Sequence, residues 1–211
     1  MNKLFAAAAS ALLAACMTSV HEQASTLQQA PVCCTGYGEF KYLPLELDKP
    51  KSVRLAKDSP AYAFDTGKSY FYAVRLPRYS SPLLLTIESE GVVAGEGRSS
   101  VLRPEILLLD DGYRVTRRIA GETFKRNNTA ILSGAIFINQ DNAAETYLVV
   151  FTRTANGGDS EMVKTFTPQM ISLGGPAITI NGSENMVSLN YGPSGLLTLL
   201  LRKYEPQRIA K

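Results

Sequence analysis

The chain has 211 residues, of which 45% are hydrophobic, 19% charged and 9% aromatic, with 16 Gly and 11 Pro. This composition is globular and excludes a long disordered chain, a collagen and a coiled coil. Twenty-two Lys and Arg against nineteen Asp and Glu give a net charge of +3, which is too balanced for a dedicated nucleic-acid binder. One His and three Cys leave little material for a metal centre, so we expect neither a metal site nor a cofactor.

The first sixteen residues, MNKLFAAAASALLAAC, are typical of a bacterial lipoprotein signal. The apolar run Leu4–Ala15 spans about 18 Å as a helix, which is too short for a hydrocarbon core of about 30 Å. Leu13-Ala14-Ala15-Cys16 resembles a lipobox, so we predict that the Cys16 thiol receives a diacylglycerol before cleavage exposes its amine for a third acyl chain, and that Cys16 anchors the protein in the membrane. Asp directly after the lipidated Cys commonly marks retention in the inner membrane of enteric bacteria. This chain has Met17 there, so sorting to the periplasmic face of the outer membrane is favoured. The alternatives are an ordinary signal peptide with a chance Cys, or a buried N-terminal helix.

The segment that follows is polar and is predicted to be a tether. Thr18–Pro31 shows no apolar period and contains the only histidine, His21, so we expect no Ser-His or Cys-His catalytic pair in the folded domain. Cys33 and Cys34 are adjacent and lie in an oxidising compartment if the chain is exported. They form either a redox-sensitive bond, a bridge to a partner, a structural kink where the tether meets the domain, or two unpaired buried thiols.

From Phe40 onward the sequence consists of short apolar runs separated by Gly, Pro, Asn and Asp, which is typical of β-strands and turns. Segments with a strand-like pattern lie at 52–56, 61–65, 69–76, 83–89, 103–109, 113–119, 129–139, 146–154, 177–180, 186–189 and 195–203. Between Ala155 and Pro176 the strand-like pattern is interrupted. A helical turn at Asp159-Ser160 and a short helix beginning at Thr167-Pro168 are predicted there.

This pattern predicts an all-β fold: a single antiparallel β-sandwich or jelly-roll-like domain of about nine strands with one or two short helices. The predicted organisation is a lipoprotein signal peptide at 1–15, an acylated N-terminus and tether at 16–38, the sandwich at 39–205 and a C-terminal tail at 206–211.

Candidate residues for chemistry are few, and we expect no enzymatic activity. Glu88 and Glu90, with Glu122 and Asp110-Asp111, are the carboxylates that a glycan hydrolase would need, although such residues usually only solvate a sandwich surface. A basic patch is predicted around the middle hairpin; it either contacts anionic lipid or cell-wall polymer or is a solvated strand face. Its members are Arg114, Arg117, Arg118, Lys125 and Arg126.

Tyrosines are the candidates for binding a carbohydrate, because aromatic faces complement the C–H faces of pyranose rings and the chain has no Trp. The candidate platforms are Tyr70, Tyr72, Tyr79 and Tyr113. The alternative is that these side chains are half-buried core residues with a wet hydroxyl group.

Two strand motifs, RPEILLLD at 103–110 and YLVVFTRT at 147–154, resemble those of the MalM family, the maltose operon periplasmic proteins. The resemblance extends over about Phe40–Lys203 and implies an exported β-rich protein linked to maltodextrin transport. It supplies no catalytic or binding residues. We therefore expect a protein that binds or helps to import carbohydrate. The alternatives are an accessory subunit that packs against another envelope protein, and a cell-wall glycan hydrolase.

Overall fold

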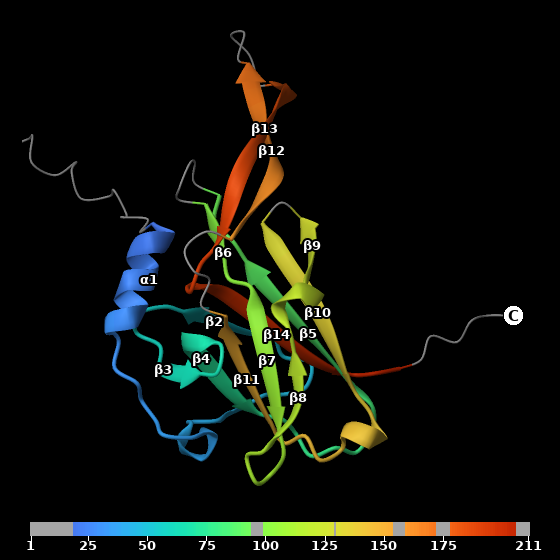
Figure 1. Cartoon of the computed structure of the whole chain (residues 1–211). Coiled ribbons are helices and arrows are strands. Elements are labelled where there is room, and N and C mark those ends of the chain that lie inside the picture. The colour runs from blue at the N-terminus through green and yellow to red at the C-terminus, as the bar shows by residue number, and fades with distance from the viewer. Residues whose placement is uncertain (1–18, 94–98, 129, 154–158, 172–177, 206–211) are drawn as a thin grey trace, which may run out of the picture.

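The computed structural model describes residues 19–93, 99–128, 130–153, 159–171 and 178–205. Most of these residues are in strands that form two large sheets and one small sheet (Figure 1). The first sheet contains β1 (Leu43–Pro44), β3 (Ala61–Phe64), β4 (Gly67–Arg75), β7 (Pro104–Leu109), β8 (Val115–Ile119) and β11 (Tyr147–Thr152). The second contains β2 (Lys51–Leu55), β5 (Leu83–Glu90), β9 (Lys125–Asn128), β10 (Ile131–Ile138) and β14 (Gly195–Lys203). The third contains β6 (Ser100–Val101), β12 (Ser160–Ile171) and β13 (Ile178–Tyr191).

The two large sheets pack face to face, which confirms the predicted all-β sandwich. Alternate residues of β5, from Leu83 to Ile87, and of β14, from Leu197 to Leu201, point into one buried cluster. Val74, Ile106 and Leu148 of the first sheet belong to the same cluster. Burial of each such side chain contributes about 1.5–3 kcal/mol, so this interface is the main source of stability.

The first sheet is also covered on its outer face. Phe71, Leu107, Val149 and Phe151 point away from the second sheet and form a second buried cluster with Phe40 from the N-terminal segment. The ring of Phe40 stacks on that of Phe71 with centroids 4.1 Å apart. This double burial explains why every residue of β7 is buried, although its sequence does not alternate.

The structure corrects the prediction of a tether without regular structure at Thr18–Pro31. Val20–Gln29 form helix α1, which begins at Ser19, whose side chain accepts a hydrogen bond from the Glu22 N–H (3.2 Å). Leu27 is buried in the core, and Lys68 donates to the carbonyl groups of Gln28 and Ala30 at the other end of the helix. One buried apolar residue is enough to dock this helix but too few to produce an apolar period in the sequence.

The structure also corrects the two helices predicted between Ala155 and Pro176. Ser160–Ile171 form the long strand β12, which pairs with β13 throughout. The hairpin of β12 and β13 projects from the sandwich (Figure 1). Pro168 lies where the register shifts between Thr167 and Gln169, a position that tolerates its missing N–H. A long-range strand partner therefore overrides the local signal for a helix.

Ionic and aromatic contacts fix the root of this hairpin. Arg126 of β9 donates to the Glu161 carboxylate (2.9 Å), and the Tyr191 hydroxyl donates to the same oxygen (2.6 Å). These hydrogen bonds lower the pKa of Glu161 to about 2. The guanidinium of Arg103 lies 3.5 Å from the centre of the Tyr191 ring. The hairpin is therefore attached to both large sheets.

The remaining elements are short. Three 3₁₀ helices, η1 (Tyr37–Glu39), η2 (Gly121–Thr123) and η3 (Gln140–Asn142), lie in connections. The described residues contain more strands than predicted, because short strands such as β1, β6 and β9 carry too few residues for a recognisable pattern. Two of the pairings, β1 with β4 and β13 with β6, are parallel.

We expect Phe40→Ala to lower the free energy of unfolding by about 3–5 kcal/mol, because it removes the aromatic ring that covers the outer face of the first sheet. Urea denaturation of a soluble Cys16→Ser chain would measure the change. Val115→Ala, at a residue that is 48% exposed, is the control and should alter stability by less than about 0.5 kcal/mol. Equal losses in the two variants would contradict the proposed covering role.

Candidate functional site

A cavity of about 470 Å³ lies at the end of the sandwich where β4 ends and β11 begins. Two loops form it, and we call it the end cavity: residues 76–80 after β4 and residues 140–146, which include η3. The Leu76 N–H donates to the Thr146 carbonyl (2.9 Å), and the Thr146 N–H donates to the Leu109 carbonyl (2.8 Å). The Asn139 side chain accepts from the Asp141 N–H (3.0 Å) and fixes the start of η3. One end of each loop is therefore held by the sheet.

The lining of the end cavity combines one aromatic ring with planar and hydroxyl polar groups. Tyr79 is half-buried and packs against the main core, whereas Arg78, Ser80 and Gln140 are exposed. Arg78 forms no ion pair with any residue that the structure describes. A ring that is held in place, beside donors and acceptors that are available, can bind a polyhydroxylated ligand.

Glu145 is the carboxylate in the wall of the end cavity. Its side chain is 2% exposed and forms an ion pair with Arg117 of β8 (2.7 Å), which also donates to the Phe137 carbonyl (3.1 Å). Burial raises the pKa of Glu145, and hydrogen bonding to Arg117 partly opposes that rise. Glu145 therefore supports the cavity wall through its partner on β8, which is separated from β11 by β7 in the sheet.

The predicted tyrosines do not form one site. Tyr79 lines the end cavity, Tyr70 is 1% exposed and belongs to the main core, and Tyr72 is half-buried beside the disulfide described below. Tyr113 lies elsewhere, on the outer face of the first sheet. Tyr70 is thus a core residue, but it is fully buried and its hydroxyl is inaccessible to solvent, which differs from the half-buried residue with a wet hydroxyl that the alternative interpretation described.

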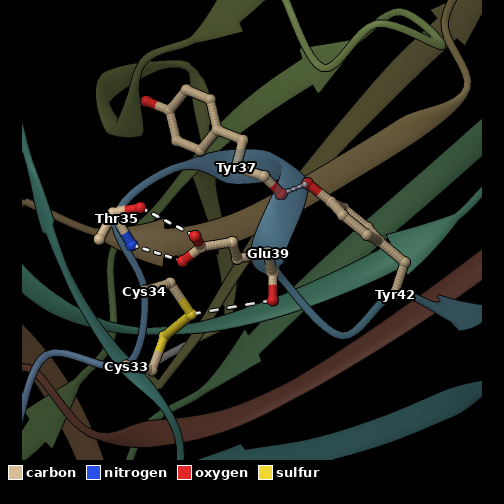
Figure 2. The surroundings of a disulfide bond; sticks show 6 residues. All are labelled: Cys33, Cys34, Thr35, Tyr37, Glu39 and Tyr42. Carbon is tan, nitrogen blue, oxygen red and sulfur yellow. Dashed lines mark hydrogen bonds between the residues drawn. A yellow bond between two sulfur atoms is a disulfide. The ribbon is translucent and has the colours of Figure 1, made fainter.

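Tyr113 stacks with two tyrosines that the sequence interpretation missed. Its ring centre is 4.8 Å from that of Tyr147 and 5.8 Å from that of Tyr42. The Tyr42 hydroxyl donates to the Tyr37 carbonyl (2.9 Å; Figure 2), and burial raises the pKa of Tyr42. Tyr113 follows the turn that joins β7 to β8, and Tyr147 pairs with Leu109 of β7. Only the strand pairing brings the three rings together.

Cys33 and Cys34 form a disulfide bond, one of the alternatives that the sequence left open. The Cys33 N–H donates to the Ala61 carbonyl (2.9 Å), which joins this segment to β3. Beyond the disulfide, Glu39 accepts from the Thr35 N–H (2.7 Å) and from the Thr35 hydroxyl (2.9 Å), and these bonds lower the pKa of Glu39 (Figure 2). Cys34 packs against the outer aromatic cluster. The disulfide therefore lies in an ordered loop.

The carboxylates proposed for a hydrolase do not face each other in a cleft of sugar size. Glu88 and Glu90 lie on the outward side of β5, and of the two only Glu90 lines a described cavity. Asp110 accepts from the N–H groups of Gly112 and Arg114 and closes the β7–β8 turn. Glu122 lines a cavity of only about 50 Å³ and lies 3.9 Å from Arg153.

The predicted basic patch is largely neutralised by neighbouring groups. Its arginines form ion pairs: Arg114 with Asp110, Arg117 with Glu145, Arg118 with Asp65 and Glu105, and Arg126 with Glu161. Lys125 donates to the Glu122 carbonyl. His21 is exposed on α1, and Cys16 lies outside the described residues.

In the described ranges, no group of three or more His, Cys, Asp or Glu side chains is placed to hold a metal ion. The part of the chain that the structure describes also has no helix of the length and hydropathy that a membrane span requires.

Comparison with known families gives one match. The sequence model of the maltose operon periplasmic protein precursor (MalM) matches residues 66–169, which confirms the resemblance inferred from the strand motifs. Comparisons with curated proteins and with solved structures find no significant match. All residues that line the end cavity lie in the matched range, whereas Cys33 and Cys34 lie outside it.

We expect Arg117→Met to destabilise the fold by about 3–5 kcal/mol near neutral pH, because it leaves the buried Glu145 carboxylate without its counter-charge. The pKa of Glu145 should rise further. An acid with a raised pKa binds its proton more tightly in the folded state, so the variant should lose stability as the pH rises from about 4.5 through that raised pKa. Urea denaturation at pH 5 and pH 8 would measure this loss.

Two further variants separate the ion pair from a general loss of packing. Adding Glu145→Gln to Arg117→Met should remove the pH dependence and restore most of the stability at pH 8. Arg78→Met, at an exposed arginine of the same cavity, should change stability by less than about 0.5 kcal/mol. The assignment is wrong if Arg117→Met is as stable as Arg78→Met at pH 8.

Proposed function

We propose, from the membership of residues 66–169 in the maltose operon periplasmic protein (MalM) family, that the protein is a non-enzymatic lipoprotein that binds maltodextrin or assists its transport. In this proposal, acylated Cys16 anchors it to the periplasmic face of the outer membrane. The family is described as periplasmic, which agrees with the signal-like sequence at residues 1–15.

The observation that carries the carbohydrate proposal is the end cavity. In this cavity a half-buried aromatic ring, Tyr79, meets a guanidinium and a carboxamide, those of Arg78 and Gln140. A larger cavity of about 540 Å³ is also lined by a tyrosine, Tyr70, but that residue is only 1% exposed. Pyranose rings present C–H faces to an aromatic ring and hydroxyl groups to planar polar side chains. All residues that line the cavity lie in the region that the family model matches, which supports a role that the family shares.

The size of the end cavity agrees with a short oligosaccharide. Its volume of about 470 Å³ lies within the range of about 300–1,000 Å³ that small-molecule sites occupy. Its lining exposes more polar than apolar surface, which suits a sugar better than a lipid or an aromatic compound. Sheet hydrogen bonds fix the two loops at Leu76 and Thr146, and Tyr79 is held by its packing against the main core, which limits the ordering needed when a ligand binds.

We expect the soluble Cys16→Ser chain to bind maltoheptaose saturably in a calorimetric titration, and maltose more weakly. Tyr79→Ala and Arg78→Ala should each reduce the affinity about tenfold, which corresponds to the loss of a ring contact or a charged hydrogen bond. Tyr204→Ala removes a tyrosine that is 42% exposed and outside the cavity, and it should leave the affinity unchanged. Absence of heat at concentrations sufficient for a millimolar site would exclude sugar binding.

The proposed anchor lies close to the folded domain. Ser19, which caps α1, follows Cys16 by three residues, a length that spans at most about 11 Å. Gly192 at the end of β13 lies against Val20, so the chain enters the domain beside the root of the β12–β13 hairpin. An acylated Cys16 would therefore hold the domain against the bilayer surface.

We expect cells that produce the protein to incorporate labelled palmitate into it, and Cys16→Ser to abolish the label. A chain with Cys33→Ser and Cys34→Ser should retain the label, because the acylation signal precedes only Cys16. Label that persists in Cys16→Ser, or that is absent from the unmodified protein, would rule out the anchor.

A second candidate function, an accessory subunit of an envelope complex, is favoured by the β12–β13 hairpin. Met162 and Met186 are 57% and 55% exposed, and β12 is an edge strand of its sheet. If no glycan binds, a photo-crosslinking residue at position 162 of the membrane-bound protein would identify a neighbour in the envelope.

A further inference from the structure

The second sheet carries apolar side chains on its outer face that neither buried cluster of the described residues includes. Leu84 of β5 and Leu200 of β14 point outward, beside Phe137 of β10, which is 40% exposed. Leu196 and Ile131 lie on the same face, and none of the five residues belongs to either cluster. Antiparallel sheets that face water usually present polar residues there, so these side chains indicate a contact surface, which we call the open face.

Opposite charges lie toward the two ends of the open face. Glu88 is on the outward side of β5, and Arg202 is on the outward side of β14, where it pairs with Leu84. Arg202 is therefore four residues from Glu88 along the sheet, a distance of about 13 Å. Neither of them forms an ion pair with any residue that the structure describes. The other charged residues on the outward side of these strands are Glu90 on β5, Arg54 on β2 and Lys125 on β9.

We propose that two copies of the chain form a homodimer by stacking their open faces with the strands antiparallel. A two-fold axis at the level of Thr86 and Leu200, which pair, exchanges the two ends of the sheet. Glu88 and Arg202 lie two residues from this level on opposite sides, so Glu88 of each copy faces Arg202 of the other. Sheets that pack face to face are about 10 Å apart, a gap that a glutamate and an arginine side chain can span together.

The order of charges on the open face supports a second copy as its occupant. A partner with a purely apolar surface would cover the leucines but remove water from Glu88 and Arg202 without supplying a counter-charge. Two copies stacked with parallel strands would place Glu88 opposite Glu88. Antiparallel stacking supplies each charge with its opposite and buries Leu200 and Phe137 at the same time. The open face shares no residue with the lining of the end cavity, so the proposal does not depend on carbohydrate binding.

Charge reversal tests the alignment of the two copies. In sedimentation velocity across a concentration series, we expect the soluble Cys16→Ser chain to show a reversible monomer–dimer equilibrium. Arg202→Glu and Glu88→Arg should each weaken the dimer at least about tenfold, because each places like charges opposite each other at both symmetry-related contacts. The double variant should recover the dimer, because it exchanges the charges at both contacts. Lys41→Glu, at an exposed residue of the N-terminal segment, alters the net charge as Arg202→Glu does and should leave the dimer unchanged.

Cross-linking tests the position of the two-fold axis and does not depend on the folding of the charge variants. Ala135 is exposed and pairs with Thr86, so it lies close to its counterpart in the second copy. A short bis-maleimide should link two copies of the soluble Ala135→Cys chain, whereas Val115→Cys, at a residue of β8 that is 48% exposed, should remain unlinked. The proposal is overturned if the soluble Cys16→Ser chain is monomeric at every concentration, if the double charge reversal dimerises as weakly as the single ones, or if Ala135→Cys links no better than Val115→Cys.

Discussion

The first sheet must be buried on both faces, and most features of the structure follow from that constraint. Its central strands carry apolar side chains in both directions: Val150 and Leu148 point to the second sheet, whereas Val149 and Phe151 point outward. An uncovered outer face would be a large exposed apolar patch. Phe40 of the N-terminal segment covers this face, and the Cys33 N–H donates to the carbonyl of Ala61, the first residue of β3. The disulfide loop and the stacked tyrosines both lie in or under this cover.

The longer strands were largely predictable because they are apolar runs of strand length bounded by turn residues. In β5 and β14 the structure buries alternate residues, although leucines such as Leu84 and Leu200 also occupy outward positions. The errors occur where a partner distant in sequence decides the conformation. Thr167-Pro168 is a valid local start for a helix, but pairing with β13 along the whole of β12 provides more hydrogen bonds than one helical turn. In α1 the only buried apolar residue is Leu27, so periodicity gave no signal.

The candidate sites were less predictable than the fold, since sequence identifies residue types but not which of them meet. Tyr79 and Tyr72 were both recognised as candidates, yet they line different cavities. Glu145 was not recognised, because nothing near it in sequence indicates that Arg117, on a strand two positions away in the sheet, would be its partner. The arginines that suggested a basic surface belong to ion pairs with acids far along the chain, such as Arg118 with Asp65. Arginines that suggest a basic surface in the sequence therefore serve in the folded chain as partners of acidic side chains.

The position of β14 has a consequence for the way this chain acquires its structure. β14 is the last strand that the structure describes, and it lies between β2 and β5, which are separated from it by more than a hundred residues. The second sheet cannot close until residues 195–203 are available, so β2 and the edge of β5 that faces away from β10 stay without a strand partner until synthesis of the chain is nearly complete. Pairing of the C-terminal strand is therefore the step that joins the two parts of the second sheet, β2 on one side and β5, β10 and β9 on the other.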